Sequence, residues 1–263
     1  MRLARNCVRF EGGISGGCDA AIQTANAVRT LFAYDEQPNF PPRYNVAPTQ
    51  PIPIVRLIDG KRSFALARWG FIPAWVKDPK TFSLLVNARG ESVLDKPAFR
   101  NAMRRRRCLI PADGFYDWRD GTPKRPYFVR PKSGGPVAFA GLWETWTGPN
   151  GEEVDSAAIV TTRANRMLAA IHDRMPVIVA PEAFNLWLDC AKVDATTATA
   201  LIAPAPEALL ECYEVSPAVN RTANDDASLI APVTETRLVT PAEGEDAAAA
   251  TKQKKRNNQL TLF

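Results

Sequence analysis

The segment His172-Asp173-Arg174-Met175-Pro176 contains the only histidine of the chain. Residues 164–171 before it carry apolar side chains at helical spacing, and residues 177–179 after it read as a buried strand. An imidazole with an ordinary pKa near ~6.5 can transfer protons at neutral pH, and Arg174 could hold an anion. This junction is therefore a candidate site for proton transfer. The alternative is a histidine that only caps the C-terminus of a helix.

Asn87 and Arg89 follow directly on a short apolar stretch, residues 84–86, that reads as a buried strand. In an extended chain their side chains point to the same side. An amide can orient a carbonyl group, and a guanidinium can clamp a phosphate in a fixed fork. The pair thus predicts a place where a nucleotide is positioned, although an internal ion pair from Arg89 to Glu91 or Asp95 would explain the arginine equally well.

Asp117 lies near the end of another apolar segment, Cys108 to Trp118. A carboxylate beside apolar rings has its pKa raised by desolvation, which suits it to act as a general acid or base. Asp113, directly before Gly114, is predicted to be a turn residue. Asn45 and Thr49 are likewise expected to stabilise a tight turn through bonds from their side chains to the backbone.

Positive charge and aromatic residues occur together along the chain. The net charge is +5, with six tryptophans. Phosphates pair with arginine and lysine, and unstacked bases lie on aromatic rings, so this combination is typical of proteins that bind single-stranded nucleic acid. The alternative is that most of the tryptophans belong to the core. The run from Arg104 to Arg107 is predicted to be a solvated helix end, with a phosphate track as its other interpretation.

Composition excludes several classes of protein. At 263 residues with 46% apolar side chains, the chain can bury a sizeable core. No apolar run is long enough to span a bilayer, and no secretory signal is recognisable, so a cytoplasmic protein without membrane contact is expected. The cysteines are odd in number and scattered: Cys7, Cys18, Cys108, Cys190 and Cys212. We therefore expect no disulfide framework and no paired-cysteine zinc site. The single histidine also argues against a histidine-rich metal centre, so the prediction is no metal and no cofactor, with a carboxylate site for magnesium or calcium as the alternative.

The pattern of elements predicts one α+β domain with a curled, mainly antiparallel β-sheet and peripheral helices. The expected strands are residues 52–58, 63–69, 127–130, 137–143, 157–161 and 177–179, with an Asn150-Gly151 hairpin. The expected helices are residues 20–32, 97–105, 164–171 and 181–190. From about residue 239 the composition changes to a polar, basic tail that cannot bury enough apolar surface to fold.

Five ordered motifs between Asn39 and Asn220 resemble the SRAP family, the SOS-response-associated, abasic-site-processing proteins. They are Pro41-Pro42-Arg43-Tyr44-Asn45-Val46-Ala47-Pro48-Thr49, Arg68-Trp69-Gly70-Phe71-Ile72-Pro73-Ala74-Trp75, Asn87-Ala88-Arg89-Gly90-Glu91, residues 107–118 and residues 172–176. The resemblance implies a single SRAP-type domain at residues 18–238, preceded by an atypical extension at 1–17 and followed by a tail at 239–263.

The resemblance also implies a chemistry. Members of the family trap the ring-opened aldehyde of an abasic site in single-stranded DNA with an N-terminal cysteine, whose amine forms a Schiff base and whose thiol closes a thiazolidine. An α-amine has a pKa near ~8 and stays partly neutral at pH 7, which a lysine does not. Removal of a short N-terminal extension, a peptidase-like step, exposes that cysteine.

By this resemblance, Asn87 orients the reacting groups and His172 shuttles a proton during ring opening, while Asp117 stands where the family has a glutamate. The shorter side chain of Asp117 retracts the carboxylate by about one methylene relative to that glutamate, and small misplacements can be costly in catalysis. The residues expected to contact DNA are Trp69, Arg89, Trp118 and Arg174.

The N-terminus departs from the family, because no cysteine follows Met1. Counting back from Val28-Arg29-Thr30-Leu31-Phe32, Cys18 falls near the expected place of the reactive cysteine. Cys18 would need cleavage after Gly17, or a different start of the chain, to act. If neither occurs, the protein is a non-covalent single-stranded DNA-binding relative. A third alternative is a thiol peptidase that pairs a cysteine with His172.

The last five residues resemble the short peptide by which bacterial repair proteins dock on the sliding clamp. Gln259 would fix the register, and Leu260, Leu262 and Phe263 would supply apolar contacts. A flexible arm with an apolar anchor suits recruitment to a replication fork, so the sequence predicts the clamp as a partner and association with the nucleoid during repair. A tail without function is the alternative.

Overall fold

The chain is described by a computed structural model that covers residues 8–10, 28–36 and 41–233. Strands dominate this part of the chain. They are β1 (Val8–Phe10), β2 (Arg43–Val46), β3 (Pro51–Ile58), β4 (Lys61–Trp69), β5 (Asn87–Arg89), β6 (Arg107–Ala112), β7 (Gly114–Arg119), β8 (Arg125–Pro131), β9 (Val137–Thr147), β10 (Glu153–Arg163), β11 (Arg174–Pro176), β12 (Ile178–Val179) and β13 (Leu210–Glu214). The α+β class predicted from the sequence is confirmed.

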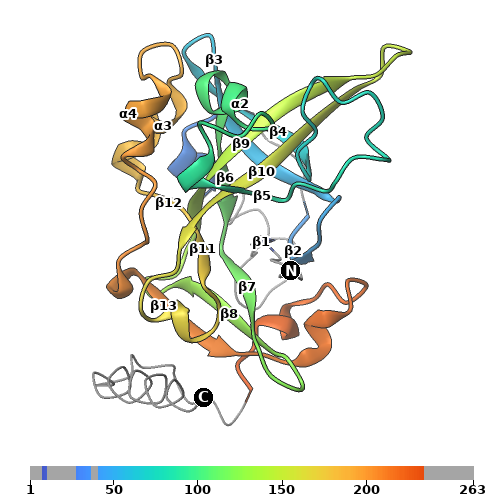
Figure 1. Ribbon diagram of the computed structural model, residues 1–263. Helices are drawn as coiled ribbons and strands as arrows, with labels where there is room; N and C mark the ends of the chain where they lie inside the picture. Colours follow the sequence, from blue (N-terminus) through green and yellow to red (C-terminus); the bar gives the residue numbers. More distant parts are fainter. Residues whose placement is uncertain (1–7, 11–27, 37–40, 234–263) are drawn as a thin grey trace, which may run out of the picture.

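Helices are short and peripheral. The α-helices beyond residue 41 are α2 (Arg100–Arg105), α3 (Phe184–Leu188) and α4 (Ala195–Thr199). The 3-10 turns are η1 (Gly90–Ser92), η2 (Leu168–Ala170), η3 (Pro181–Ala183), η4 (Glu207–Leu209), η5 (Pro217–Asn220) and η6 (Ala227–Ile230). Figure 1 shows α2, α3 and α4 grouped at one end of the molecule, away from β7, β8 and β13.

The larger sheet curls into a ring. Its eight strands run in the order β11-β10-β4-β3-β6-β9-β12, and β5 pairs with β10. Because β9 also pairs with β10, the strands β10, β4, β3, β6 and β9 close on themselves. Most of these pairings are antiparallel, and only β4 and β5 run parallel to β10. The curled sheet expected from the sequence is thus present.

The second sheet continues from the first. Its five strands run in the order β13-β8-β7-β1-β2. The chain passes from β6 in the ring to β7 in this sheet across a single residue, Asp113, which fits its predicted role at a change of direction. β1 pairs with both β2 and β7, so a strand of this sheet lies inside the range 1–17 that the sequence assigned to an extension.

Apolar side chains fill the ring and the space beneath the helices. One buried cluster contains Ile52, Trp69, Phe115 and Phe139, and a second one contains Phe32, Phe71, Phe184 and Trp187. Burial alternates over the last four residues of β4 and along β5, so polar residues there remain available at the surface while their neighbours pack in the core. A rigid double sheet therefore holds the strand ends on which the motifs lie.

The expected helix over residues 164–171 is wrong, since only η2 is helical there. The Asn165 side chain accepts a hydrogen bond from the backbone N–H of Leu168 at 3.0 Å and donates one to the Ala205 carbonyl at 3.0 Å. In addition, the backbone N–H of Ala164 donates to the carbonyl of Asp173. Side-chain bonds of this kind compete with a helical ladder, and here they produce a tight loop.

Asn45 also differs from its expected role. Its side chain is fully buried, and Nδ2 donates to the carbonyls of Val219, Arg221 and Asn224 at 3.0 to 3.1 Å. It therefore ties β2 to the segment around η5 rather than closing its own turn. Residues 20–27 of another expected helix lie outside the described residues, whereas residues 28–32 are helical.

Candidate functional site

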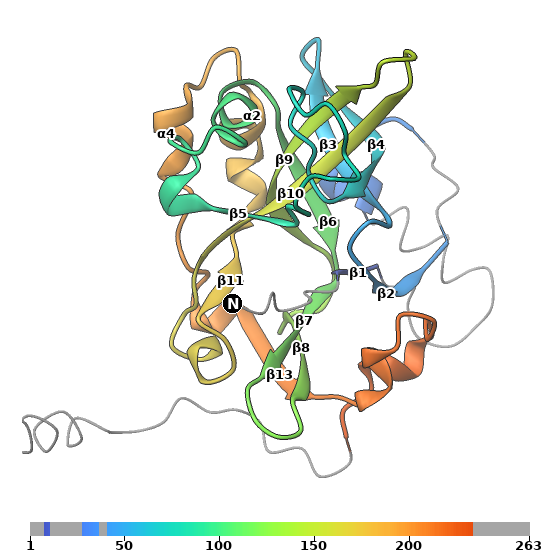
Figure 2. The same ribbon diagram turned by 45° about the vertical axis from the view of Figure 1, so that its right-hand side comes forward.

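Three of the sequence motifs meet around β10. On one edge of this strand Thr161 pairs with Arg89 of β5, and on the other edge it pairs with Pro176 of β11. Asn87 and Arg174 are thereby brought to the two strands that flank β10, although 87 positions separate them in the chain. Figure 2 shows β5 and β10 above β7, the strand that carries Asp117.

His172 and Asp117 form the centre of the candidate site. His172 lies in the turn before β11, and its Nδ1 is 3.8 Å from Oδ2 of Asp117 on β7. The imidazole is partly exposed, whereas the carboxylate is buried, with 4% of its side chain exposed. The pair therefore joins the two sheets and presents one accessible proton carrier backed by a shielded carboxyl group.

Burial gives Asp117 an unusual acidity. Desolvation raises the pKa of this carboxyl group to about 6, against the opposing attraction of His172. The backbone N–H of Trp118 donates to Oδ1 at 2.9 Å, which also favours the charged form. Because desolvation is the larger effect, Asp117 keeps its proton up to a higher pH than an ordinary aspartic acid does. Such a group can deliver a proton as well as accept one.

The backbone sets the tautomer of His172. The N–H of Arg174 donates to Nδ1 at 3.0 Å, so Nδ1 is the acceptor in the neutral imidazole and Nε2 carries the proton. Asp173 places a second carboxylate oxygen 3.4 Å from Nδ1. With Nδ1 turned toward the protein, the N–H at Nε2 is available to a ligand. This arrangement suits proton exchange at Nε2.

Asn87 contributes a polar atom without a partner. Its Oδ1 is buried and accepts no hydrogen bond within the described part of the chain. A buried acceptor left unpaired costs about 1 to 3 kcal/mol, so such atoms in folded proteins call for an explanation. A ligand amine or hydroxyl that donates to Oδ1 would remove this cost. The observation agrees with the positioning role that the resemblance implied.

The two predicted arginines differ in their surroundings. Arg174 forms a bidentate ion pair with Glu91, with Nη1 and Nη2 at 2.7 and 2.8 Å from the two carboxylate oxygens, and Nη2 also donates to the Thr161 carbonyl at 2.8 Å. Hydrogen bonding to Arg174 lowers the pKa of Glu91. Arg89 is instead exposed at the end of β5. Of the two, Arg89 has the more exposed side chain.

The tryptophans divide between core and surface. Trp69 is fully buried and donates from Nε1 to the Val86 carbonyl at 3.1 Å, a position that does not fit direct contact with DNA. Trp118 is half-buried, and its Nε1 donates to Oδ1 of Asn220 at 2.7 Å. Trp75 is 58% exposed and packs edge-on against Phe82. Trp75 is therefore a candidate stacking platform, in the same motif as Trp69.

Of the three described cysteines, Cys190 is partly exposed, and the other two are poor candidates for a nucleophile. Cys108 and Cys212 are buried, and desolvation raises the pKa of both thiols, that of Cys212 to about 12. Neither is poised to form a thiolate at neutral pH. Cys18 lies outside the described residues. No group of three potential metal ligands occurs among residues 8–10, 28–36 and 41–233.

Sequence reasoning missed two contributors. Glu91 was considered only as a partner of Arg89, whereas it holds Arg174 from the other side of β10. The segment Cys7-Val8-Arg9-Phe10 was also overlooked, although its alternation of apolar and polar residues is a strand signal. Val8 pairs with Phe115, two residues before Asp117, so the chain directly after Cys7 belongs to the sheet that carries the candidate acid.

No helix in the described part of the chain is long and apolar enough to cross a membrane.

Comparisons with known proteins agree with the motifs. The family model described as SOS response associated peptidase (SRAP) matches residues 16–222. The abasic site processing protein YoqW of Bacillus subtilis is 40% identical over 192 residues, which cover 72% of this chain and 85% of that protein. The abasic site processing protein HMCES of Mus musculus is 32% identical over 252 residues, covering 81% and 71%.

Solved structures show the same architecture. A protein from Bacteroides thetaiotaomicron superposes with a TM-score of 0.70 at 25% identity, covering 81% of this chain and 96% of the other. A protein from Bordetella bronchiseptica gives a TM-score of 0.66 at 25% identity, covering 80% and 100%. The motifs, the sheet that positions them and these matches lead to one conclusion: the chain belongs to the SOS response associated peptidase (SRAP) family.

Proposed function

We propose that the protein processes abasic sites by binding single-stranded DNA and linking itself covalently to the ring-opened sugar aldehyde through an N-terminal cysteine. The relatives named above are abasic site processing proteins, which supports the general activity. The observation that carries the proposal is the buried Asp117 beside His172, whose Nδ1 is 3.8 Å from the carboxylate. These two groups can each carry a proton, and Oδ1 of Asn87, on β5, is a buried acceptor without a partner among the described residues.

The proposed reaction has three steps: ring opening, formation of a Schiff base and closure of the thiazolidine. His172 assists opening of the sugar ring by moving the hydroxyl proton, which yields the free aldehyde. The neutral α-amine adds to the aldehyde carbon, and Asp117 donates the proton with which the hydroxyl leaves as water. The thiol then adds across the resulting C=N bond and closes a thiazolidine. The net change is the loss of one water, and Asn87 accepts a hydrogen bond from the attacking amine.

The nucleophile must first become N-terminal, by hydrolysis of the peptide bond before it. Cys18 is the candidate from the motif spacing, and it requires cleavage after Gly17. The pairing of β1 with β7 supports Cys7 instead, because Val8, its neighbour in sequence, pairs two residues from Asp117. Cleavage between Asn6 and Cys7 would expose it. We propose Cys7 as the nucleophile on the basis of this pairing, with Cys18 as the alternative.

The DNA is proposed to run past the exposed residues around the pair. Arg89 and Trp75 supply a cation and a stacking face, and Trp118 contributes the exposed part of its ring. Glu91 holds the guanidinium of Arg174 in a fixed place beside this path, where 19% of the Arg174 side chain is exposed. Trp69 supports this surface from the core. These contacts do not depend on the base sequence, and they would hold the strand whether or not covalent capture follows.

A denaturing gel tests the proposal. Protein is mixed with single-stranded DNA that carries one natural abasic site, and with the same strand carrying a tetrahydrofuran analogue, which lacks the aldehyde. A slow-migrating species with the natural site alone is the expected result. No such species, together with equal salt-sensitive binding of both strands, would instead establish the second candidate, a non-covalent DNA-binding protein.

The C-terminal tail is the basis of a separate proposal. Gln259, Leu260, Leu262 and Phe263 lie outside the described residues, and we propose that they dock the protein on the bacterial sliding clamp. Purified clamp should bind the full chain and fail to bind a chain that lacks the last five residues. Equal binding of the two chains would refute the docking. The test is independent of abasic-site chemistry, since it contains no DNA.

A further inference from the structure

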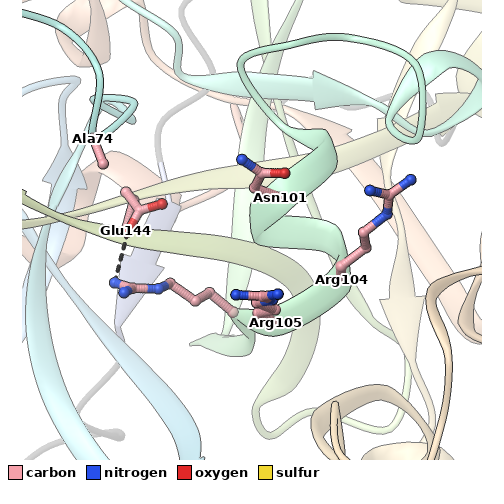
Figure 3. A pocket seen from close by; sticks show the side chains of 6 residues that line it. Ala74, Asn101, Arg104, Arg105 and Glu144 are labelled. Atoms are coloured by element: carbon pink, nitrogen blue, oxygen red, sulfur yellow. Dashed lines mark ion pairs between the residues drawn. The ribbon is translucent and has the colours of Figure 1, made fainter.

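Three consecutive arginines form a basic pocket away from the His172–Asp117 pair. A cavity of about 350 Å³ at the end of α2 is lined by Ala74, Asn101, Arg104, Arg105, Arg106 and Glu144 (Figure 3). We propose that this arginine pocket binds a backbone phosphate of the nucleic acid at a second anchoring point. The inference rests on the proposed function for its choice of DNA as the ligand.

The pocket is held in place by the fourth arginine of the run. Arg107 is buried, with 1% exposure, and its guanidinium lies among main-chain carbonyls. The acceptors are those of Met103, Trp187, Asp189 and Val193. Arg107 thus fastens the end of α2 to the segment around α3. Its neighbours are left at the surface of a fixed backbone, which a binding pocket requires.

The remaining charges favour an anion. Arg106 pairs with Glu144 at 2.6 Å and lies over the ring of Trp143 at 5.1 Å, so its charge is largely balanced. Arg104 and Arg105 are exposed, and neither forms an ion pair within the described residues. Burial raises the pKa of Glu144, while Arg106 opposes this rise. Even with Glu144 charged, the pocket carries a net charge of about +2, three arginines against one carboxylate.

The donors fit a phosphate group. Guanidinium forks match phosphate oxygens with two parallel hydrogen bonds, and the amide of Asn101 adds a neutral donor. The ring of Trp143 is covered by Arg106, and no aromatic side chain of the described residues lines the pocket, so the lining favours a backbone phosphate over a stacked base. The pocket lies at the C-terminal, negative end of the α2 dipole, which does not attract an anion. The attraction must therefore come from the arginine side chains.

The position of the pocket suits a continuous strand of DNA. Ala74 at its edge directly precedes Trp75, the exposed platform of the candidate site. Figures 1 and 2 both place α2 above β5, on which Asn87 and Arg89 lie. A strand that passes β5 and stacks on Trp75 would bring its next phosphates toward Arg104 and Arg105.

Binding of single-stranded DNA without any abasic site tests the inference, because no covalent step contributes. The variant Arg104→Gln/Arg105→Gln is compared with Arg100→Gln/Lys132→Gln, which removes the same charge from exposed residues outside the pocket. Affinity of a fluorescent strand is measured over a range of salt concentrations. The pocket variant should bind more weakly, and the slope of log K against log salt should become less negative by about 0.7 for each phosphate that the variant no longer neutralises.

The control variant should retain a steeper slope than the pocket variant. Equal slopes in the native protein and the pocket variant would overturn the inference, as would equal losses in both variants, which would indicate only a general charge effect. Absence of DNA binding by the native protein would overturn it too. If the native protein never captures an abasic site but the pocket variant alone flattens the salt dependence, the proposed covalent function fails and the arginine pocket is supported.

Discussion

Oδ2 of Asp117, on β7, lies 3.8 Å from Nδ1 of His172, in the turn before β11, so two acid-base groups meet at the junction of the two sheets. The same Nδ1 accepts the N–H of Arg174 at 3.0 Å. The carboxyl group therefore does not share a proton with the neutral imidazole through that nitrogen. The site therefore has two separate proton carriers, a shielded carboxyl group and an outward-facing imidazole. Ring opening and loss of water each require one such carrier.

The protonated form of Asp117 is predicted to be needed for capture. Its pKa of about 6 means that the protonated fraction falls as the pH rises through this value, so the rate of water loss should fall as well. The variant Asp117→Asn should lose this dependence along with most of the rate, and Asp117→Glu should recover part of both. Rates of crosslinking between pH 5 and 8 measure this, and an unaltered profile in Asp117→Asn would exclude the role.

The same residue is predicted to reduce stability at neutral pH. The folded pKa of about 6 lies above the ordinary 3.8, so the folded state binds more protons and the free energy of unfolding decreases as the pH rises from about 4 to 6. The loss should be roughly 1 to 3 kcal/mol. Asp117→Asn should therefore be more stable than the native protein at pH 7 and equal to it near pH 4. Denaturant titrations at both values check the sign.

Replacement of Asn87 should affect stability and activity in different ways. Its Oδ1 is buried without a partner among the described residues, so replacement by alanine removes an unsatisfied acceptor and should leave the free energy of unfolding unchanged or raise it by up to about 1 kcal/mol. Capture of abasic DNA should nevertheless fall sharply. Thermal melting and crosslinking rates are measured on the same preparation. A large loss of stability would show that Asn87 is structural.

Glu91 is predicted to orient Arg174 at little energetic benefit to the fold. The Glu91 side chain is 45% exposed, and exposed ion pairs contribute about 0 to 1 kcal/mol. Glu91→Gln should keep the native stability while the release of Arg174 raises non-covalent affinity for DNA and lowers the crosslinking rate at saturating DNA. Arg174→Lys cannot make the bidentate pair and serves as the matched variant. If DNA affinity and crosslinking rate both rise or both fall in Glu91→Gln, Glu91 does not orient Arg174.

Trp75 and Trp69 form a matched pair within one motif. Trp75→Ala should weaken DNA binding by about 1 to 3 kcal/mol with little effect on folding, since its ring is 58% exposed. Trp69→Ala should instead destabilise the fold by about 3 to 5 kcal/mol, because its ring is fully buried. Fluorescence binding and denaturant unfolding separate these effects. Similar outcomes for the two variants would contradict the division into surface and core.

These two tryptophans also show where sequence reasoning ends. Each lies among strand-like and basic residues, and side-chain type alone does not reveal that Trp69 points into the ring while Trp75 lies on the loop that follows. The polar residues that end apolar strands, Asn87 and Asp117, could be selected from the sequence, as could His172. Their convergence depends on the pairing of β10 with β5 and β11 and on the turn before β11, which are long-range contacts that local patterns do not encode.

The ion pair of Arg174 with Glu91 was hidden for the same reason, because the partners are 83 positions apart. The role of β1 was hidden as well, since the family pattern draws attention to the residue directly after Met1. The alternation over a three-residue strand is only a weak signal in the sequence, and the pairing of β1 with β7 is visible only in the sheet.

The intact mass of the protein after reaction with single-stranded abasic DNA tests the central claim most directly. The native chain and the variants Cys7→Ala and Cys18→Ala are each mixed with the natural abasic strand, and the mass of protein and product is recorded. We predict a product equal to processed protein plus DNA minus one water in the native chain and in Cys18→Ala, with the N-terminus at Cys7, and no product in Cys7→Ala. Capture lost only in Cys18→Ala would move the nucleophile to that residue. Full-length protein that binds the strand and never gains its mass would contradict covalent capture.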